Sequence, residues 1–159
     1  MKKKTVKVFG ETSYLLGRGK DGDMYYLVEP KFDCGWYWGM GYIHSYTNQR
    51  QPERSRDIQM HTHFDSMFFR EHDGHTNFKE KFVETPLADK EIWTLMELMK
   101  SAYTLREMAD MCYRGGAHYT TNPCKELLQD WNEYNRINDV LLPAIFEQVR
   151  NLLTGGDAE

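Results

Sequence analysis

The sequence is poor in cysteine and has no long apolar run, and each shortage excludes a class of protein. It contains 3 cysteines in 159 residues, at Cys34, Cys112 and Cys124. Because they are odd in number and widely spaced, we expect reduced thiols, not a disulfide framework or a cysteine zinc site. No apolar stretch reaches the length of a transmembrane helix. The basic segment 1–6 has no apolar run behind it, so we expect no secretory signal, no membrane partner and a cytoplasmic location.

Several functional signatures are also missing. The chain has no GxGxxG, Walker A or GxSxG motif, so the usual marks of nucleotide-binding folds and α/β-hydrolases are absent. The net charge of −4 argues against a general nucleic-acid binder. The charge is uneven, because residues 1–60 carry 10 basic and 7 acidic side chains whereas residues 61–159 carry 10 and 17. The acidic half has either a basic partner or merely solvated helix faces.

The apolar pattern changes its period along the chain. Alternation predicts a strand at 5–9, and short apolar or aromatic segments between turn signals predict strands at 14–16, 24–28, 36–47 and 58–64, with a hairpin turn at Asp21-Gly22. A short helical turn at 65–70 and a polar loop at 71–77 follow. Strands followed by helices predict an α+β fold, with an antiparallel meander packed against a helical bundle. We expect one domain over 1–159, β-rich in 1–84 and helical in 85–155.

Four helices are expected after Pro86. The first covers 89–100, and the second begins at a capping box formed by Thr104 and Glu107 and ends at Gly115-Gly116. Asn122-Pro123 predicts the start of a third helix. The fourth begins near Asp139, so that Pro143 lies in its first turn, and ends at 155–156.

An aromatic segment at 36–46 is the first candidate for function. On a strand, Trp36, Trp38 and Tyr42 share one face with His44, while Gly39, Gly41 and Ile43 share the other. The rings either form core against the C-terminal helices or line a groove for a protein or for unstacked bases. We favour the core, with Trp36 and Trp38 largely buried.

A histidine-rich segment is the second candidate. His61, His63 and Asp65 would project from one strand face, and His75 could join them from the next loop. These side chains are suitable ligands for a divalent metal. Without metal, His61 or His63 could act as a general base oriented by Asp65. The alternatives are hydrogen-bonded or exposed histidines; we expect no cofactor, with a divalent metal as the open option.

An arginine-rich segment at 48–57 is the third candidate. Arg50, Arg54 and Arg56 follow the aromatic strand and could contact phosphate or an acidic protein face. The alternative is a solvated loop.

The segments Trp36-Tyr37-Trp38-Gly39-Met40-Gly41-Tyr42 and His61-Thr62-His63-Phe64-Asp65-Ser66, with the helix at Glu91-Ile92-Trp93, resemble a group of small proteins carried by phages and plasmids of gut Firmicutes. Some small proteins of such elements are anti-CRISPR inhibitors. The resemblance implies a counter-defence or accessory role and carries no catalytic motif.

Two leading functional hypotheses result, with a structural interaction module that has neither property as a third possibility. The first is an inhibitory binding protein that docks on a host protein or ribonucleoprotein, such as a type II CRISPR effector with its guide RNA. The alternative is a small nuclease or phosphoesterase that uses His61, His63 and Asp65, with or without metal. The sequence leaves the oligomeric state open.

Overall fold

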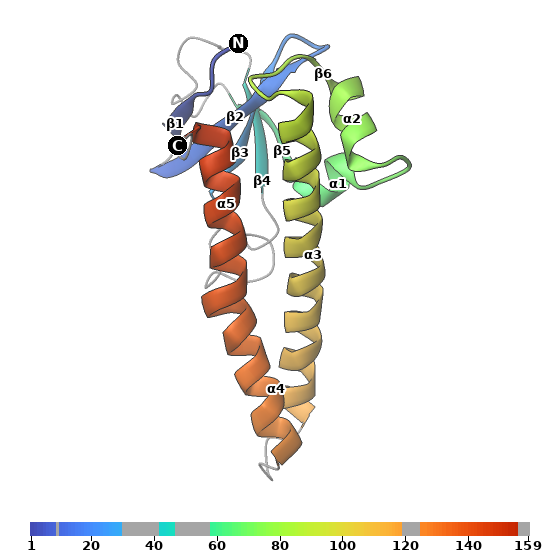
Figure 1. Cartoon of the computed structure of the whole chain (residues 1–159), viewed down its shortest axis with the longest axis vertical. Helices are drawn as coiled ribbons and strands as arrows, with labels where there is room; N and C mark the ends of the chain where they lie inside the picture. Colours follow the sequence, from blue (N-terminus) through green and yellow to red (C-terminus); the bar gives the residue numbers. More distant parts are fainter. Residues whose placement is uncertain (9, 30–41, 47–57, 119–124, 156–159) are drawn as a thin grey trace.

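A computed structural model describes residues 1–8, 10–29, 42–46, 58–118 and 125–155, with the backbone alone for 8, 42, 46, 58–61, 113–118 and 125–130. An antiparallel sheet lies at one end of the molecule, and a long helical hairpin packs beside the sheet and extends well beyond it (Figure 1). The predicted α+β class is therefore confirmed.

The sheet is a meander in which strands that follow one another along the chain are paired. The order is β1-β2-β3-β4-β5, and a sixth strand, β6, pairs with β2. All pairings are antiparallel. The strands are β1 (Thr5–Val8), β2 (Glu11–Gly19), β3 (Met24–Val28), β4 (Tyr42–Tyr46), β5 (Ile58–His63) and β6 (Phe82–Glu84).

Strand β2 is longer than the sequence pattern predicts, and β6 was not predicted. The register of β2 against β3 shifts between Leu15 and Gly17, so alternation is interrupted within the strand. A Cβ atom at Gly17 would lie 2.5 Å from the carbonyl oxygen of Glu84. The missing side chain therefore allows β6 to approach β2 closely. The predicted turn at Asp21-Gly22 is confirmed, with Gly22 at φ 88°.

The helices are α1 (Phe64–Phe68), α2 (Gly74–Lys81), α3 (Asp89–His118), α4 (Lys125–Arg136), a π-helical turn η3 (Ile137–Leu141) and α5 (Leu142–Thr154). Helix α3 forms one arm of the hairpin, and α4, η3 and α5 form the other (Figure 1). The predicted helix start near Asp139 is wrong, because α4, η3 and α5 follow one another without a break and Asp139 lies within η3. Pro143 does lie in the first turn of α5, and Gly155 ends that helix at φ 70°.

The predicted start and end of the second helix are also wrong. The capping box at Thr104 does not begin a helix, because α3 runs unbroken from Asp89 to His118. The Thr104 hydroxyl donates to the carbonyl of Lys100 at 3.0 Å, which is a bond of a helix interior. Gly115-Gly116 does not end the helix either. The predicted cap at 122–123 lies outside the described residues.

The polar segment 71–77 is also more ordered than predicted, because α2 begins within it at Gly74. The Asp73 carboxylate accepts from the backbone N–H of Thr76 at 2.8 Å and from its hydroxyl at 3.0 Å. Asp73 is thus the N-cap that satisfies the free amides of the first turn.

The main core lies between the sheet and the helices. Tyr25, Leu27 and Ile43 of the sheet pack in one buried cluster with residues of α1, α2, α3 and α5. A smaller cluster on the other face of the sheet contains Leu15 and Tyr26. The helices therefore cover one face, and α1, α2 and α3 meet at its edge (Figure 1).

Candidate functional site

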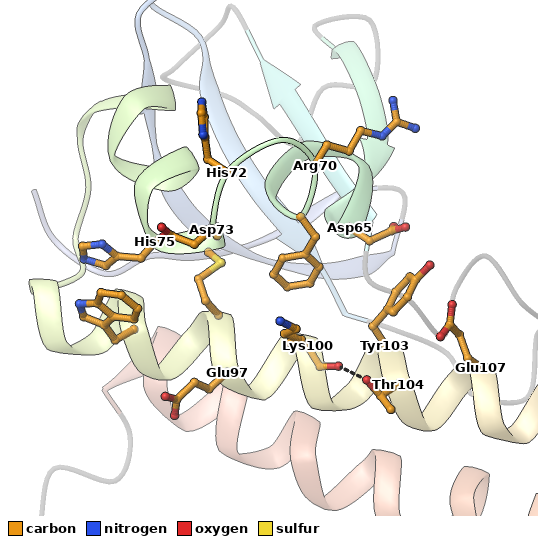
Figure 2. Close-up of a pocket in the computed structure, with 14 residues that line it drawn as sticks. Asp65, Arg70, His72, Asp73, His75, Glu97, Lys100, Tyr103, Thr104 and Glu107 are labelled. Carbon is orange, nitrogen blue, oxygen red and sulfur yellow. Dashed lines mark hydrogen bonds between the residues drawn. The ribbon is translucent and has the colours of Figure 1, made fainter.

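A groove of about 700 Å³ lies where α1, α2 and the loop between them face α3. Figure 2 shows the side chains of both walls around this hollow. Aromatic, acidic and basic residues share the lining: Asp65, Phe69, Arg70, His72, Asp73, Gly74, His75, Trp93, Met96, Glu97, Lys100, Tyr103, Thr104 and Glu107. The size is typical of a ligand or peptide site.

One wall is a single stripe of α3. Trp93, Glu97, Lys100, Thr104 and Glu107 are separated by three or four residues, so they lie on one helix face. The core residues of α3 follow a second stripe, which includes Ile92, Leu95, Met99 and Ala102. Because the two stripes differ, α3 can pack in the core and still present a polar wall to the groove.

The opposite wall is a loop fixed by one side chain. The Asn77 amide nitrogen lies 2.8 Å from the carbonyl oxygens of Phe68 and Arg70 and 3.0 Å from that of His72. Hydrogen bonds from Thr76 lower the pKa of the Asp73 carboxyl, so this cap is ionised at neutral pH. The loop at 69–73 is therefore held in one conformation by α2.

Packed aromatic rings support this wall from below. The rings of Phe64 and Phe68 lie 4.7 Å apart between centroids, and those of Phe78 and Phe82 lie 4.7 Å apart. Phe68 contacts Phe78 at 5.4 Å, which joins the two pairs. All four side chains are buried. The groove therefore rests on a dense core and not on a mobile surface.

A stacked aromatic pair closes one end of the groove. The His75 ring lies on the Trp93 indole with centroids 4.0 Å apart and planes 11° apart. His75 Nε2 is 2.8 Å from Asp89 Oδ1, which also accepts from Lys79 Nζ at 3.0 Å. The bond from Lys79, and then that with His75, lowers the pKa of the Asp89 carboxyl. Asp89 therefore stays ionised and fixes the imidazole against the indole.

Acidic and phenolic groups occupy the other end, where Figure 2 shows Asp65, Tyr103 and Glu107 side by side. Burial raises the pKa of the Tyr103 phenol, and a hydrogen bond with Glu107 and the nearby Asp65 charge raise it further. Asp65 Oδ1 is enclosed and has no hydrogen-bond partner among the described residues. A buried carboxylate oxygen without a partner is costly to the fold, which makes this end of the groove unusual.

The predicted histidine site is not assembled as the alternation suggested. Strand β5 ends at His63, so Asp65 lies on α1 and points toward α3 instead of continuing the strand face. His63 is half-buried and is not part of the groove lining. The backbone of His61 pairs with His44, and its side chain lies outside the described set.

His75 and Asp65 line the same groove, but Figure 2 shows them at opposite ends. Among the side chains that the structure describes, no three of histidine, cysteine, aspartate or glutamate are placed to share a metal ion. His61 remains a metal or catalytic candidate only as a prediction.

The other predicted binding residues lie outside the described part of the chain. These are Trp36, Trp38, Arg50, Arg54 and Arg56, together with the side chain of Tyr42. On β4, Ile43 pairs with Leu27 and belongs to the helix-facing core, whereas His44 pairs with Tyr26 of the opposite face. Within the described part of β4, His44 therefore lies on the sheet face that is turned away from the helices. The predicted burial of Trp36 and Trp38 concerns residues outside the described part of the chain and stays a prediction.

The groove itself was missed in the sequence. Its clearest signal is Trp93, which is 48% exposed and directly follows the buried Ile92. A large ring beside the core stripe of an amphipathic helix indicates a second contact surface. The loop wall gives no such signal, because it depends on the tertiary position of α2.

No protein-family model, curated protein sequence or solved structure matches the chain significantly. In the described ranges, no helix combines the length and the apolar character needed to cross a bilayer.

Proposed function

We propose that the protein is an inhibitory binding protein that engages its target through the groove between α2 and α3. The observation that carries this proposal is a preformed concave surface with an aromatic pair at one end and acidic groups at the other. Hydrogen bonds and an aromatic core fix both walls, so binding requires little ordering of the groove.

The charge of the lining favours a basic partner surface. Four carboxylates, on Asp65, Asp73, Glu97 and Glu107, accompany two permanently basic side chains, on Arg70 and Lys100. The chain beyond residue 60 has the same acidic excess. Proteins that hold nucleic acid present basic surfaces, and an acidic groove can occupy such a surface.

The candidate target is a host ribonucleoprotein, specifically a type II RNA-guided nuclease, and the proposed setting is the cytoplasm of a cell that carries the mobile element. The resemblance of 36–42, 61–66 and 91–93 to proteins of phages and plasmids supports this choice. Inhibition would arise by competition at a nucleic-acid channel of the effector.

A titration of target cleavage tests the proposal. We expect cleavage by a guide-loaded effector to fall to zero near one equivalent of protein, with the guide RNA intact on a denaturing gel. Glu107→Lys should weaken inhibition by at least about ten-fold, because a like charge then faces the basic partner. Glu147→Lys makes the same charge change at an exposed position outside the groove lining and should leave inhibition unchanged.

Equal loss with both variants would assign the effect to net charge and would contradict docking at the groove. No inhibition at excess protein would exclude this effector as the target. The predicted role of Arg50, Arg54 and Arg56 is checked in the same assay, where their removal should weaken inhibition more at raised salt.

A second candidate is a nuclease or phosphoesterase, which the unpaired Asp65 oxygen favours. Asp65 would act as a base or metal ligand, with His63 near it in sequence. The same assay separates this activity from binding, because an enzyme acts below one equivalent and leaves a shortened strand. Asp65→Asn should then abolish the cut, whereas Glu147→Gln, which removes an exposed carboxylate outside the groove lining, should leave the cut unchanged.

A further inference from the structure

The exposed part of Trp93 is the most specific unassigned feature of the groove. His75 covers one face of the indole at 4.0 Å, yet Trp93 remains 48% exposed. The exposed part of Trp93 therefore includes ring atoms that the imidazole does not cover. A rigid, half-exposed indole that is backed by a stacked imidazole is a platform for a planar or cationic group.

Its surroundings indicate which group would bind. Glu97 is one helical turn beyond Trp93, so the two side chains are neighbours on α3. In Figure 2 His75 lies on the α2 side of α3, and Glu97 projects from the other side. Trp93 and Glu97 both line the groove, so a group that stacks on the exposed part of the indole has this carboxylate as a neighbour on the same helix.

A second hollow continues on the side of the helix from which Glu97 projects. It measures about 640 Å³ and is lined by Glu97, Lys100, Ser101, Thr104 and Leu105. It shares Glu97, Lys100 and Thr104 with the main groove, so the two hollows adjoin. A side chain that lies on Trp93 therefore has room for its stem and for the backbone that carries it.

We propose that Trp93 and Glu97 form a subsite for an arginine side chain of the partner protein. The guanidinium would stack on the exposed part of the indole and donate hydrogen bonds to the Glu97 carboxylate. Arginine fits better than lysine, because its planar cation both stacks on a ring and pairs with a carboxylate in fork geometry. This proposal deepens the proposed function and rests on it for the source of the arginine.

A nucleobase is the competing planar ligand, and the local charge disfavours it. Asp89 holds His75 against Trp93, and Glu97 lies one helical turn away. The carboxylates would repel the phosphates that flank any stacked base. Lys100 is seven residues from Trp93, about two turns along the helix, and is farther away than Glu97.

Fluorine NMR of the full chain labelled with 5-fluorotryptophan provides the test. The chain has 4 tryptophans, and Trp93→Phe assigns the Trp93 signal. The probe is an acetylated six-residue peptide with one central arginine among glycine and serine, titrated to millimolar concentration. Matched peptides replace arginine with lysine, which keeps the charge, or with citrulline, which keeps the shape without the charge.

We expect the arginine peptide to shift the Trp93 signal saturably and to leave the other tryptophan signals in place. The lysine peptide should bind about three-fold or more weakly, and the citrulline peptide should produce no saturable shift. Glu97→Gln should weaken the arginine peptide by roughly three- to ten-fold. Glu147→Gln removes one exposed carboxylate elsewhere and should have no effect.

Equal binding of the citrulline peptide, or no Trp93 shift with arginine, would overturn the subsite. A shift produced by a single-stranded oligonucleotide but not by arginine would assign the indole to bases and would also overturn it. Because the peptides contain no effector, the result is independent of cleavage inhibition. One-to-one inhibition without arginine binding would retain the proposed function alone, and arginine binding without inhibition would retain the subsite alone.

Discussion

The two halves of α3 pack in different ways. Near the sheet, the buried side of the helix is apolar and includes Ile92, Leu95 and Met99. In the second half, which packs against the other arm of the hairpin, a buried side chain is Arg106, which is only 5% exposed. The described part of the second half also buries Ala109, but it adds a buried polar pair to the apolar packing.

That polar pair connects the two arms of the hairpin. Arg106 Nη1 donates to Asn138 Oδ1 at 2.8 Å, and Asn138 Nδ2 donates to the Tyr134 carbonyl at 2.9 Å. Asn138 lies in η3, where the wider π turn allows both Ile137 and Asn138 to be buried. The buried Arg106 cation and its neutral partner Asn138 favour one alignment of the two arms. The pair contributes less stability than apolar packing would.

The largest loss of stability is expected from a substitution near the sheet. Phe68→Ala removes the ring that joins the aromatic pairs beneath the groove and should lower the free energy of unfolding by about 3–5 kcal/mol. Val83→Ala at a 60% exposed site is the control and should change it by less than about 0.5 kcal/mol. Urea unfolding followed by circular dichroism measures both. A loss below about 1 kcal/mol for Phe68→Ala would show that these rings are not core.

An intermediate loss of stability is expected from a substitution in the helical hairpin. Asn138→Ala leaves the buried Arg106 guanidinium without its acceptor and should cost about 1–3 kcal/mol. The double variant Arg106→Met with Asn138→Leu removes both polar groups and should regain most of that loss. A double-mutant cycle by urea unfolding gives the coupling. If the stability losses of the two single variants simply add in the double variant, Arg106 and Asn138 do not interact directly. The two halves of α3 would then not differ in how they pack.

The smallest loss of stability at neutral pH is expected from a substitution where the sheet meets α5. The Tyr14 hydroxyl donates to Glu29, which also pairs with Arg150 of α5. Burial, and then the bond to Glu29, raises the pKa of Tyr14 to about 12. An unfolded tyrosine ionises near pH 10, so the stability from this group is complete below about pH 10 and is lost as pH rises toward 12.

Tyr14→Phe should therefore make the loss of stability between pH 10 and 12 less steep. Some alkaline loss should remain, because burial also raises the pKa values of Tyr25 and Tyr103. Urea midpoints measured across this range check the prediction. An unchanged alkaline slope would show that Tyr14 is not linked to folding.

The sheet was largely predictable because its signals are local. Short apolar runs on either side of the Asp21-Gly22 turn identify β2 and β3 without knowledge of the rest of the fold. The Thr104-x-x-Glu107 pattern was misleading, since it caps a helix only where the preceding chain is not helical. Here Ala102 continues the buried stripe of α3 and keeps the chain helical through Thr104.

The candidate site was less predictable because it depends on tertiary placement. The prediction for Asp65 assumed that β5 continues past His63, but Phe64 turns into the core and starts α1. The pairing of His75 with Trp93 joins α2 to α3 across 18 positions of sequence, and no local pattern encodes it. Asp73 was the exception: its spacing to Thr76 carries a cap signal that sequence reasoning overlooked.

The Asn77 side chain has a consequence for the kinetics of association. Its contacts with three carbonyl oxygens hold the loop wall before any partner arrives. A partner therefore meets a groove that is already in its binding conformation. The association rate is then not limited by a rearrangement of the loop wall. Association should be controlled by diffusion and by the acidic charge of the lining. Differences in affinity among partners should then appear mainly in how long each complex lasts.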